Sequence, residues 1–220
     1  MAQEQADKKA AARSRRLRIV LGGVLAVLVI GGAAAAAVLS GDEGGNGGEG
    51  PRTAGDAPAV DLPEPQTSNL EEAVETAGCE LIHAEYEGAD HAEKEFTAAD
   101  YESNPPTSGA HFPTWYEDGI YEPGGVPDLG QLVHTLEHGR INVQHAPGTP
   151  QSVVAQLEAF AAEKTGYHML VYENATDMPY EVAATAWTQL VGCEEYSPEA
   201  IDVLRTFYDS YVDKGPEQVP

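Results

Sequence analysis

The chain has 220 residues, of which 42% are apolar, and this is enough for one domain with a hydrophobic core. Residues 1–18 hold six of the 12 basic residues, so residues 19–220 combine six basic with 34 acidic side chains, a net charge of −28. This charge excludes nucleic acid and anionic lipid surfaces as partners of the acidic part, because like charges repel each other.

Residues 19–39 contain no charged side chain. At about 1.5 Å per residue, a helix of this length spans the roughly 30 Å hydrocarbon core of a bilayer. The basic tail at 1–18 precedes it and acidic residues follow, which predicts a cytoplasmic N-terminus and an extracytoplasmic C-terminal part. A cleaved signal peptide is the alternative, but its apolar region is usually about 7–15 residues long. We therefore predict an uncleaved single-pass membrane anchor.

Residues 40–66 are rich in glycine and proline, which predicts a flexible linker between the anchor and one domain at 67–220. Within the domain, Asn69 and Gly78 are typical of the two ends of a short helix. A strand is predicted next, at 79–86. The region 88–128 contains five prolines and is predicted to be a long loop, which in a compact domain is usually functional or disordered.

Apolar residues then recur at helical spacing, and Gly139 follows them, which predicts a helix over 129–138. Alternating residues at 141–145 predict a half-buried strand. The remaining expected elements are a helix at 150–164, a strand at 167–172, a segment at 182–191 and a helix at 197–215. The alanines at 182–191 favour a helix, but its β-branched and aromatic residues allow a strand, which we prefer. This succession predicts an α/β domain, with α+β as the alternative, and it matches the order of elements in thioredoxin-like domains.

The predicted helix over 129–138 places His134 and His138 four residues apart, with Glu137 near the same face. Imidazoles one helical turn apart can bind one metal ion, and nitrogen ligands suit copper and zinc. We therefore predict a transition-metal site, with copper favoured over zinc. The candidates for its further ligands are His111 and His145.

Two methionines bear on the choice of metal, because a thioether ligand from Met169 or Met178 would favour Cu(I). A purely structural role is the alternative to a metal site. In that interpretation His138 caps the C-terminus of the helix, and His134 forms a hydrogen bond with a loop carbonyl.

The run from His134 to His138 also matches the pattern His-x-x-Glu-His. In peptidases with this pattern two histidines hold zinc and the glutamate activates water. This third hypothesis makes the protein a zinc-dependent hydrolase in which Glu137 is catalytic.

The run Asn-Pro-Pro-Thr-Ser-Gly-Ala-His at 104–111 contains a serine and a histidine that could form a nucleophile pair. Its two prolines and Gly109 favour a positioning role for this loop instead. We expect the loop to cross the central helix and to deliver His111, with Trp115 and Tyr116 above the site.

Cys79 and Cys193 are the two cysteines of the chain. Disulfides persist outside the cytoplasm, so we predict a bridge between them. A thioredoxin-like sheet would put the two cysteines toward opposite ends, farther apart than the roughly 7 Å that a bridge permits. The two predictions therefore conflict, and we favour the bridge.

Three segments carry a resemblance to a known family: the run at 104–111, Leu-Val-His-Thr-Leu-Glu-His-Gly at 132–139, and Met-Pro-Tyr-Glu-Val-Ala-Ala-Thr-Ala-Trp at 178–187. They resemble the bacterial domain of unknown function 3105 family over about residues 70–215. The resemblance implies a single-pass membrane protein with an extracytoplasmic domain, and it implies no activity.

Two functional hypotheses therefore stand ahead of the hydrolase. The first is a membrane-anchored extracytoplasmic domain that binds copper or zinc through His134 and His138, with His111 or His145. The second is a non-catalytic accessory or interaction subunit of a membrane complex in the cell envelope.

Overall fold

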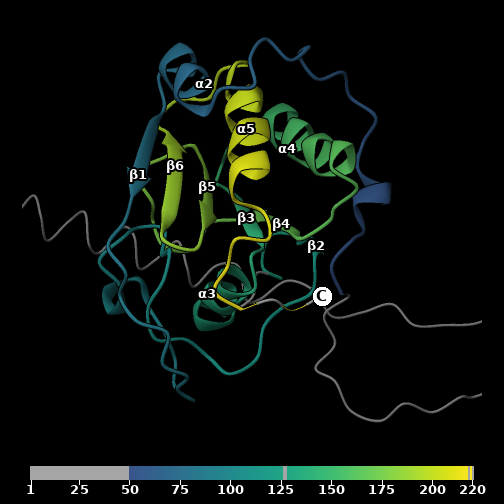
Figure 1. The fold of residues 1–220 in the computed structure, drawn as a ribbon. Helices are drawn as coiled ribbons and strands as arrows, with labels where there is room; N and C mark the ends of the chain where they lie inside the picture. The colour runs from purple at the N-terminus through teal and green to yellow at the C-terminus, as the bar shows by residue number, and fades with distance from the viewer. Residues whose placement is uncertain (1–49, 126–127, 218, 220) are drawn as a thin grey trace, which may run out of the picture. The chain divides into compact units, whose positions relative to one another are not determined.

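A computed structural model describes residues 50–125, 128–217 and 219 (Figure 1). The predicted basic tail, the predicted anchor and the first part of the predicted linker lie outside the described residues. Among the residues that are described, no helix is both long enough and apolar enough to cross a membrane.

The described part of the chain is a mixed α/β domain built on one six-stranded sheet, in the order β1-β6-β5-β3-β4-β2. The strands are β1 (Glu80–His83), β2 (Gly119–Ile120), β3 (Ile141–His145), β4 (Met169–Glu173), β5 (Val182–Ala186) and β6 (Gln189–Cys193). The helices are α2 (Leu70–Ala77), α3 (Leu129–Glu137), α4 (Gln151–Glu163) and α5 (Ala200–Tyr211), with short 3-10 helices η1 (Ala54–Asp56) and η2 (Ala98–Asp100).

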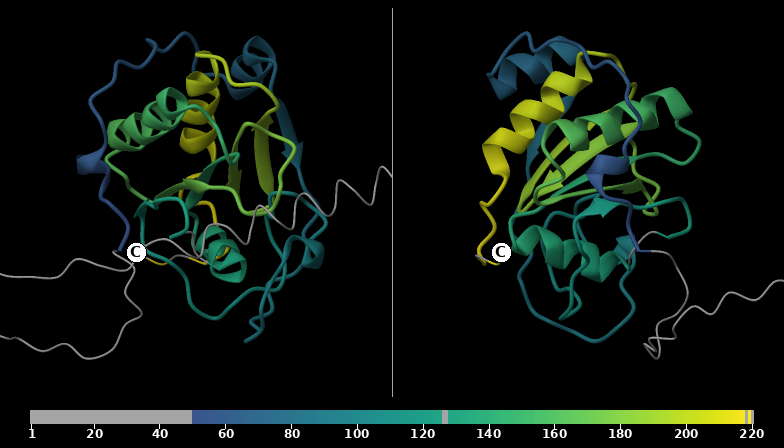
Figure 2. Two further views of the ribbon diagram at one scale, coloured as in Figure 1. Left: turned by 180° about the vertical axis from the view of Figure 1, so that it is seen from behind. Right: turned by 90° about the vertical axis from the view of Figure 1, so that its right-hand side faces the viewer.

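Helices α4 and α5 cover one face of the sheet, and α3 lies on the opposite face (Figure 2). Ile141 and Val143 of β3 belong to the main hydrophobic core, which includes Phe160 of α4 and Phe207 of α5. The side-chain amide of Asn142 points the other way and donates to the carbonyl of Leu132 in α3. All of β3 is therefore buried, and the prediction of a half-buried strand is wrong because helices pack on both faces.

The region expected to form one strand at 182–191 is a hairpin. β5 and β6 pair antiparallel, and Ala186 is opposite Gln189. Trp187 and Thr188 make the two-residue connection, with Thr188 at a φ of +60°. Such turns are usually marked by glycine or asparagine, so the sequence contained no turn signal here.

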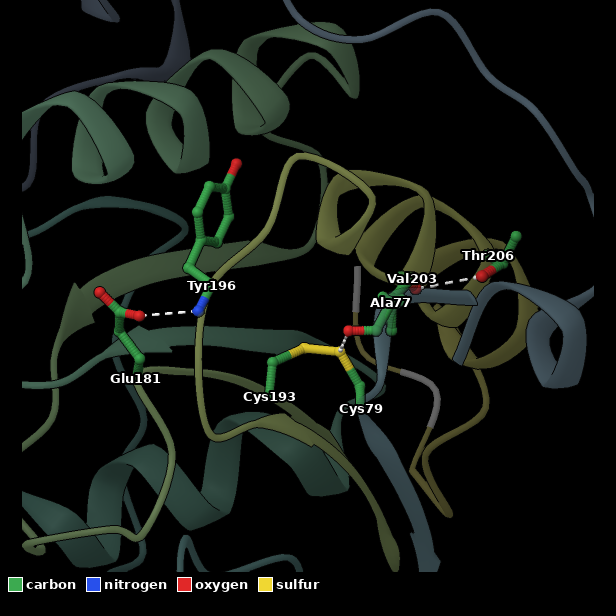
Figure 3. The surroundings of a disulfide bond; sticks show 7 residues. All are labelled: Ala77, Cys79, Glu181, Cys193, Tyr196, Val203 and Thr206. Carbon is green, nitrogen blue, oxygen red and sulfur yellow. Dashed lines mark hydrogen bonds between the residues drawn. A yellow bond between two sulfur atoms is a disulfide. The ribbon is translucent and has the colours of Figure 1, made fainter. Parts of the chain in front are cut away.

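Strand β1 pairs antiparallel with β6 at the edge of the sheet, with Glu80 opposite Gly192. This register places Cys79 beside Cys193, and the two form a disulfide with their Cα atoms 4.3 Å apart (Figure 3). In the thioredoxin-like arrangement these cysteines would lie toward opposite ends of the sheet. Because β1 lies at the sheet edge directly beside β6, the two cysteines are neighbours and the predicted bridge forms.

Residues 51–66, which belong to the predicted flexible linker, pack against the domain. The backbone of Arg52 forms an isolated antiparallel β-bridge with Ile120, and its side chain forms ion pairs with Glu122 and Glu158. Ala54 of η1 is buried in the main core. The segment is therefore held by burial, backbone pairing and charge, which its glycine and proline content did not indicate.

The ends of two helices follow from local chemistry. Asn69 accepts a hydrogen bond from the Glu72 amide at the start of α2, and Gly78 ends this helix in the left-handed conformation, as predicted. Helix α5 ends at Tyr211, short of the predicted 215. The chain then turns back to the end of α3, where the amide of Asp213 donates to the carbonyl of Gly139.

A candidate metal centre beside helix α3

The two ends of helix α3 are set by the residues that flank it. Asp128 caps its N-terminus by accepting from the amide of Gly130, and Gly139 follows its C-terminus with a φ of +80°. Gly130 lies so close to Phe96 that a Cβ there would be 2.4 Å from the ring. The long loop at 88–128 therefore packs directly on α3, and seven of the nine helix residues are buried.

The side chain of His134 has a defined orientation and tautomer. Its Nδ1 atom lies 2.6 Å from the carbonyl oxygen of Phe112. A carbonyl oxygen only accepts hydrogen bonds, so Nδ1 carries the hydrogen and Nε2 carries the lone pair. Burial lowers the pKa of His134 below its usual value, which keeps the imidazole neutral and able to bind a metal.

His111 is held in the same way. The loop at 104–111 delivers His111 to α3, as expected, where its ring contacts Glu137 and is fully buried. Its Nδ1 atom is 2.8 Å from the carbonyl oxygen of Gly109, so this nitrogen also carries the hydrogen. The free Nε2 atom faces the carboxylate of Glu137 at 3.0 Å. Gly109 has a φ of +116°, which a residue with a side chain rarely adopts.

His91 completes the cluster, and sequence reasoning missed it. Residues Asp90 and Ala92 exchange backbone hydrogen bonds with His111, and this short bridge sets the two histidines side by side. The Nε2 atom of His91 lies 3.5 Å from the Glu137 carboxylate. The ring stacks on that of His134 with 4.9 Å between centroids. The side chain is 44% exposed, so it forms the solvent-facing side of the cluster.

The ligand atoms of His91, His111, His134 and Glu137 all lie within 4.8 Å of one another. Donor atoms around a tetrahedral zinc ion are about 3.3 Å apart, given metal–nitrogen bonds of about 2.0–2.1 Å. A cluster of this size needs a modest contraction to reach that spacing. Three imidazoles and one carboxylate form a ligand set that suits zinc, copper or another divalent transition metal.

His138 borders the cluster. Its Nε2 atom is 3.0 Å from Nε2 of His134, and burial is the main cause that lowers the pKa of His138 to about 4. The Trp115 ring lies 4.5 Å from His138 and 5.4 Å from His134, which agrees with its expected position above the site. Tyr116 packs instead against Tyr121.

Glu137 lies among the candidate ligands. Its carboxylate approaches His111 and His91, the closest contact being with His111. In the hydrolase hypothesis, by contrast, it would stand beside a water on an ion held by His134 and His138. The hydroxyl of Ser108 accepts from the amide of Glu87, which fits a positioning role for this loop.

The structure does not bring His145 to the cluster. His145 follows Ile141 and Val143 on the α4 side of the sheet, whereas α3 lies on the other side. Met169 is buried in the main core, and Met178 packs in a separate cluster with Tyr180. Neither methionine therefore supports the argument for Cu(I).

The comparisons with known proteins give one result. A family model described as "Protein of unknown function (DUF3105)" matches residues 91–220, more than half of the chain, and this confirms the resemblance seen in the three motifs. The matched region contains all four residues of the cluster. No curated protein and no solved structure matches the chain.

Proposed function

The chain belongs to the family of proteins of unknown function DUF3105, and we propose that it is a membrane-anchored extracytoplasmic protein that binds one divalent transition-metal ion. The proposed ligands are His91, His111, His134 and Glu137. The ion is copper or zinc.

The pair of His111 and Glu137 carries this proposal. Because the His111 Nδ1–H is directed to the Gly109 carbonyl, the lone pair on Nε2 points at a carboxylate oxygen only 3.0 Å away. Two acceptor atoms at this distance need a proton or a cation between them. Backbone carbonyls that fix the tautomer of His111 and of His134 are the usual second shell of metal-binding histidines.

Three further features support the proposal. A net charge of −28 in residues 19–220 attracts cations to the domain. The disulfide between Cys79 and Cys193 suits an oxidising extracytoplasmic compartment. The uncharged run at 19–39, preceded by six basic residues, supports the membrane anchor.

The test is calorimetric titration of the full chain, purified in a mild detergent and stripped of metal, with Zn²⁺ and with Cu²⁺. We expect one ion per chain, bound at the cluster beside α3. His145→Ala is the matched control and should bind like the unchanged protein, since His145 lies on the other face of the sheet.

Absence of bound metal at micromolar free Zn²⁺ and Cu²⁺ would end the proposal. The accessory subunit of a cell-envelope complex would then be the better hypothesis. If His145→Ala removed binding, the ion would lie elsewhere than the cluster beside α3.

Tryptophan fluorescence gives an independent prediction. Both tryptophans of the chain border the cluster: Trp115 lies 5.4 Å from His134, and Trp187 lies 6.1 Å from His111. Cu²⁺ is paramagnetic and quenches nearby indoles, whereas Zn²⁺ has a closed shell. One equivalent of Cu²⁺ should therefore quench most of the intrinsic fluorescence, and prior saturation with Zn²⁺ should slow the quenching. Unchanged fluorescence with bound Cu²⁺ would place the ion away from both indoles.

A further inference from the structure

The C-terminal segment, defined here as residues 213–217, packs on the end of α3. The amide of Asp213 donates to Gly139, and the amide of Glu217 donates to the carbonyl of Glu137. A Cβ at Gly215 would lie 2.1 Å from the Glu137 carbonyl oxygen, so only glycine permits this approach. The backbone of a proposed ligand is thus in direct contact with the segment.

His138 lies between that segment and the proposed metal site. Since Nδ1 of His134 carries the hydrogen, its Nε2 is an acceptor, and His138 must donate from its own Nε2 across the 3.0 Å gap. The Nδ1 atom of His138 then carries no hydrogen, and it is buried with no hydrogen-bond partner among the described residues. The Glu217 carboxylate stands 3.5 Å from the same Nε2.

An ion bound to His134 removes the acceptor that His138 uses. The lone pair on Nε2 of His134 can serve either the metal or the His138 N–H, and not both. The Glu217 carboxylate is the other acceptor at this nitrogen, and its side chain is 51% exposed and able to move. A hydrogen bond from an imidazole N–H to a carboxylate is charge-assisted and short when formed.

We propose that metal binding at His134 switches the His138 N–H from His134 to Glu217, and so fastens the C-terminal segment onto α3. The inference rests on the proposed metal site. The hydrogen stays on Nε2 of His138, and only its acceptor changes. Because coupling between two equilibria is reciprocal, a docked segment also raises the affinity for the metal.

Hydrogen exchange of peptides covering residues 213–217 tests the switch, in the full chain with and without saturating Zn²⁺. We expect Zn²⁺ to slow exchange of this segment about tenfold, a typical size for such coupling. Glu217→Ala should abolish the effect and lower Zn²⁺ affinity about tenfold. Glu217→Gln should retain part of both, because its amide oxygen still accepts from His138.

Gly215→Ala provides a second variant that alters no titratable group and no proposed ligand. It should undock the segment by collision with Glu137 and lower Zn²⁺ affinity to a similar extent as Glu217→Ala. If Zn²⁺ binds and the segment exchanges equally fast with and without it, the switch is wrong and the metal site stands. If Glu217→Gln weakens binding as much as Glu217→Ala while Gly215→Ala has no effect, Glu217 is a direct ligand and the switch is overturned. If no Zn²⁺ binds, the proposed function fails first.

Discussion

Replacing His134 by alanine is expected to lower the affinity for Zn²⁺ and Cu²⁺ by well over 100-fold, more than the roughly 10–100-fold typical of second-shell losses. His134 is the one helix histidine among the four clustered donors. His138→Ala, at the residue that directly follows this helix, should lower the affinity only about tenfold, because His138 acts through Glu217. Competition titration with a chromophoric chelator measures both values.

This pair of variants separates two arrangements of the metal site. If the ion were held by His134 and His138 as a helical His-x3-His pair, both variants would lose binding equally. If only His134→Ala loses it, the ligands are those of the cluster around Glu137. Alanine is the best helix former, so α3 itself should persist in both variants. Far-UV circular dichroism is the control for folding.

Removal of the disulfide should give the largest change in stability. The double variant Cys79→Ser/Cys193→Ser opens a loop of 114 residues, and the chain-entropy model assigns such a loop about 4–5 kcal/mol. The bridge joins β1, at the sheet edge, to β6. Urea unfolding of the full chain in detergent should therefore show a much lower midpoint and a steeper slope, because the unbridged unfolded chain is less compact.

The control for this experiment is the unchanged protein with and without a reductant, which should reproduce the shift. A difference below about 1 kcal/mol between the bridged protein and the double variant would contradict the prediction. At urea concentrations where the double variant is still folded, it should bind Zn²⁺ like the unchanged protein, since Cys79 and Cys193 take no part in the cluster.

The ends of helices were predictable where a single residue type determines the backbone conformation or caps an amide. Gly78 and Gly139 end α2 and α3 because they adopt positive φ, and Asn69 begins α2 because its side chain caps an amide. The alternation at 141–145 predicted β3 with its observed bounds. The pairing of β1 was not predictable, because strand neighbours depend on contacts that are distant in the sequence.

The candidate site shows the same division. By itself the sequence determined that His134 and Glu137 share a helix that ends next to His138, that His111 precedes it on a stiff loop, and that the domain is strongly acidic, because these properties depend on spacing and composition. Only the tertiary structure decided that His91 joins the cluster and that His145 does not. Backbone pairing between the segments around His91 and His111 brings His91 to the cluster. His145 points to the face of β3 that is opposite α3, and so it stays away from the cluster. Such long-range pairing leaves no periodic pattern along the chain, and for that reason the fourth donor had no signal in the sequence.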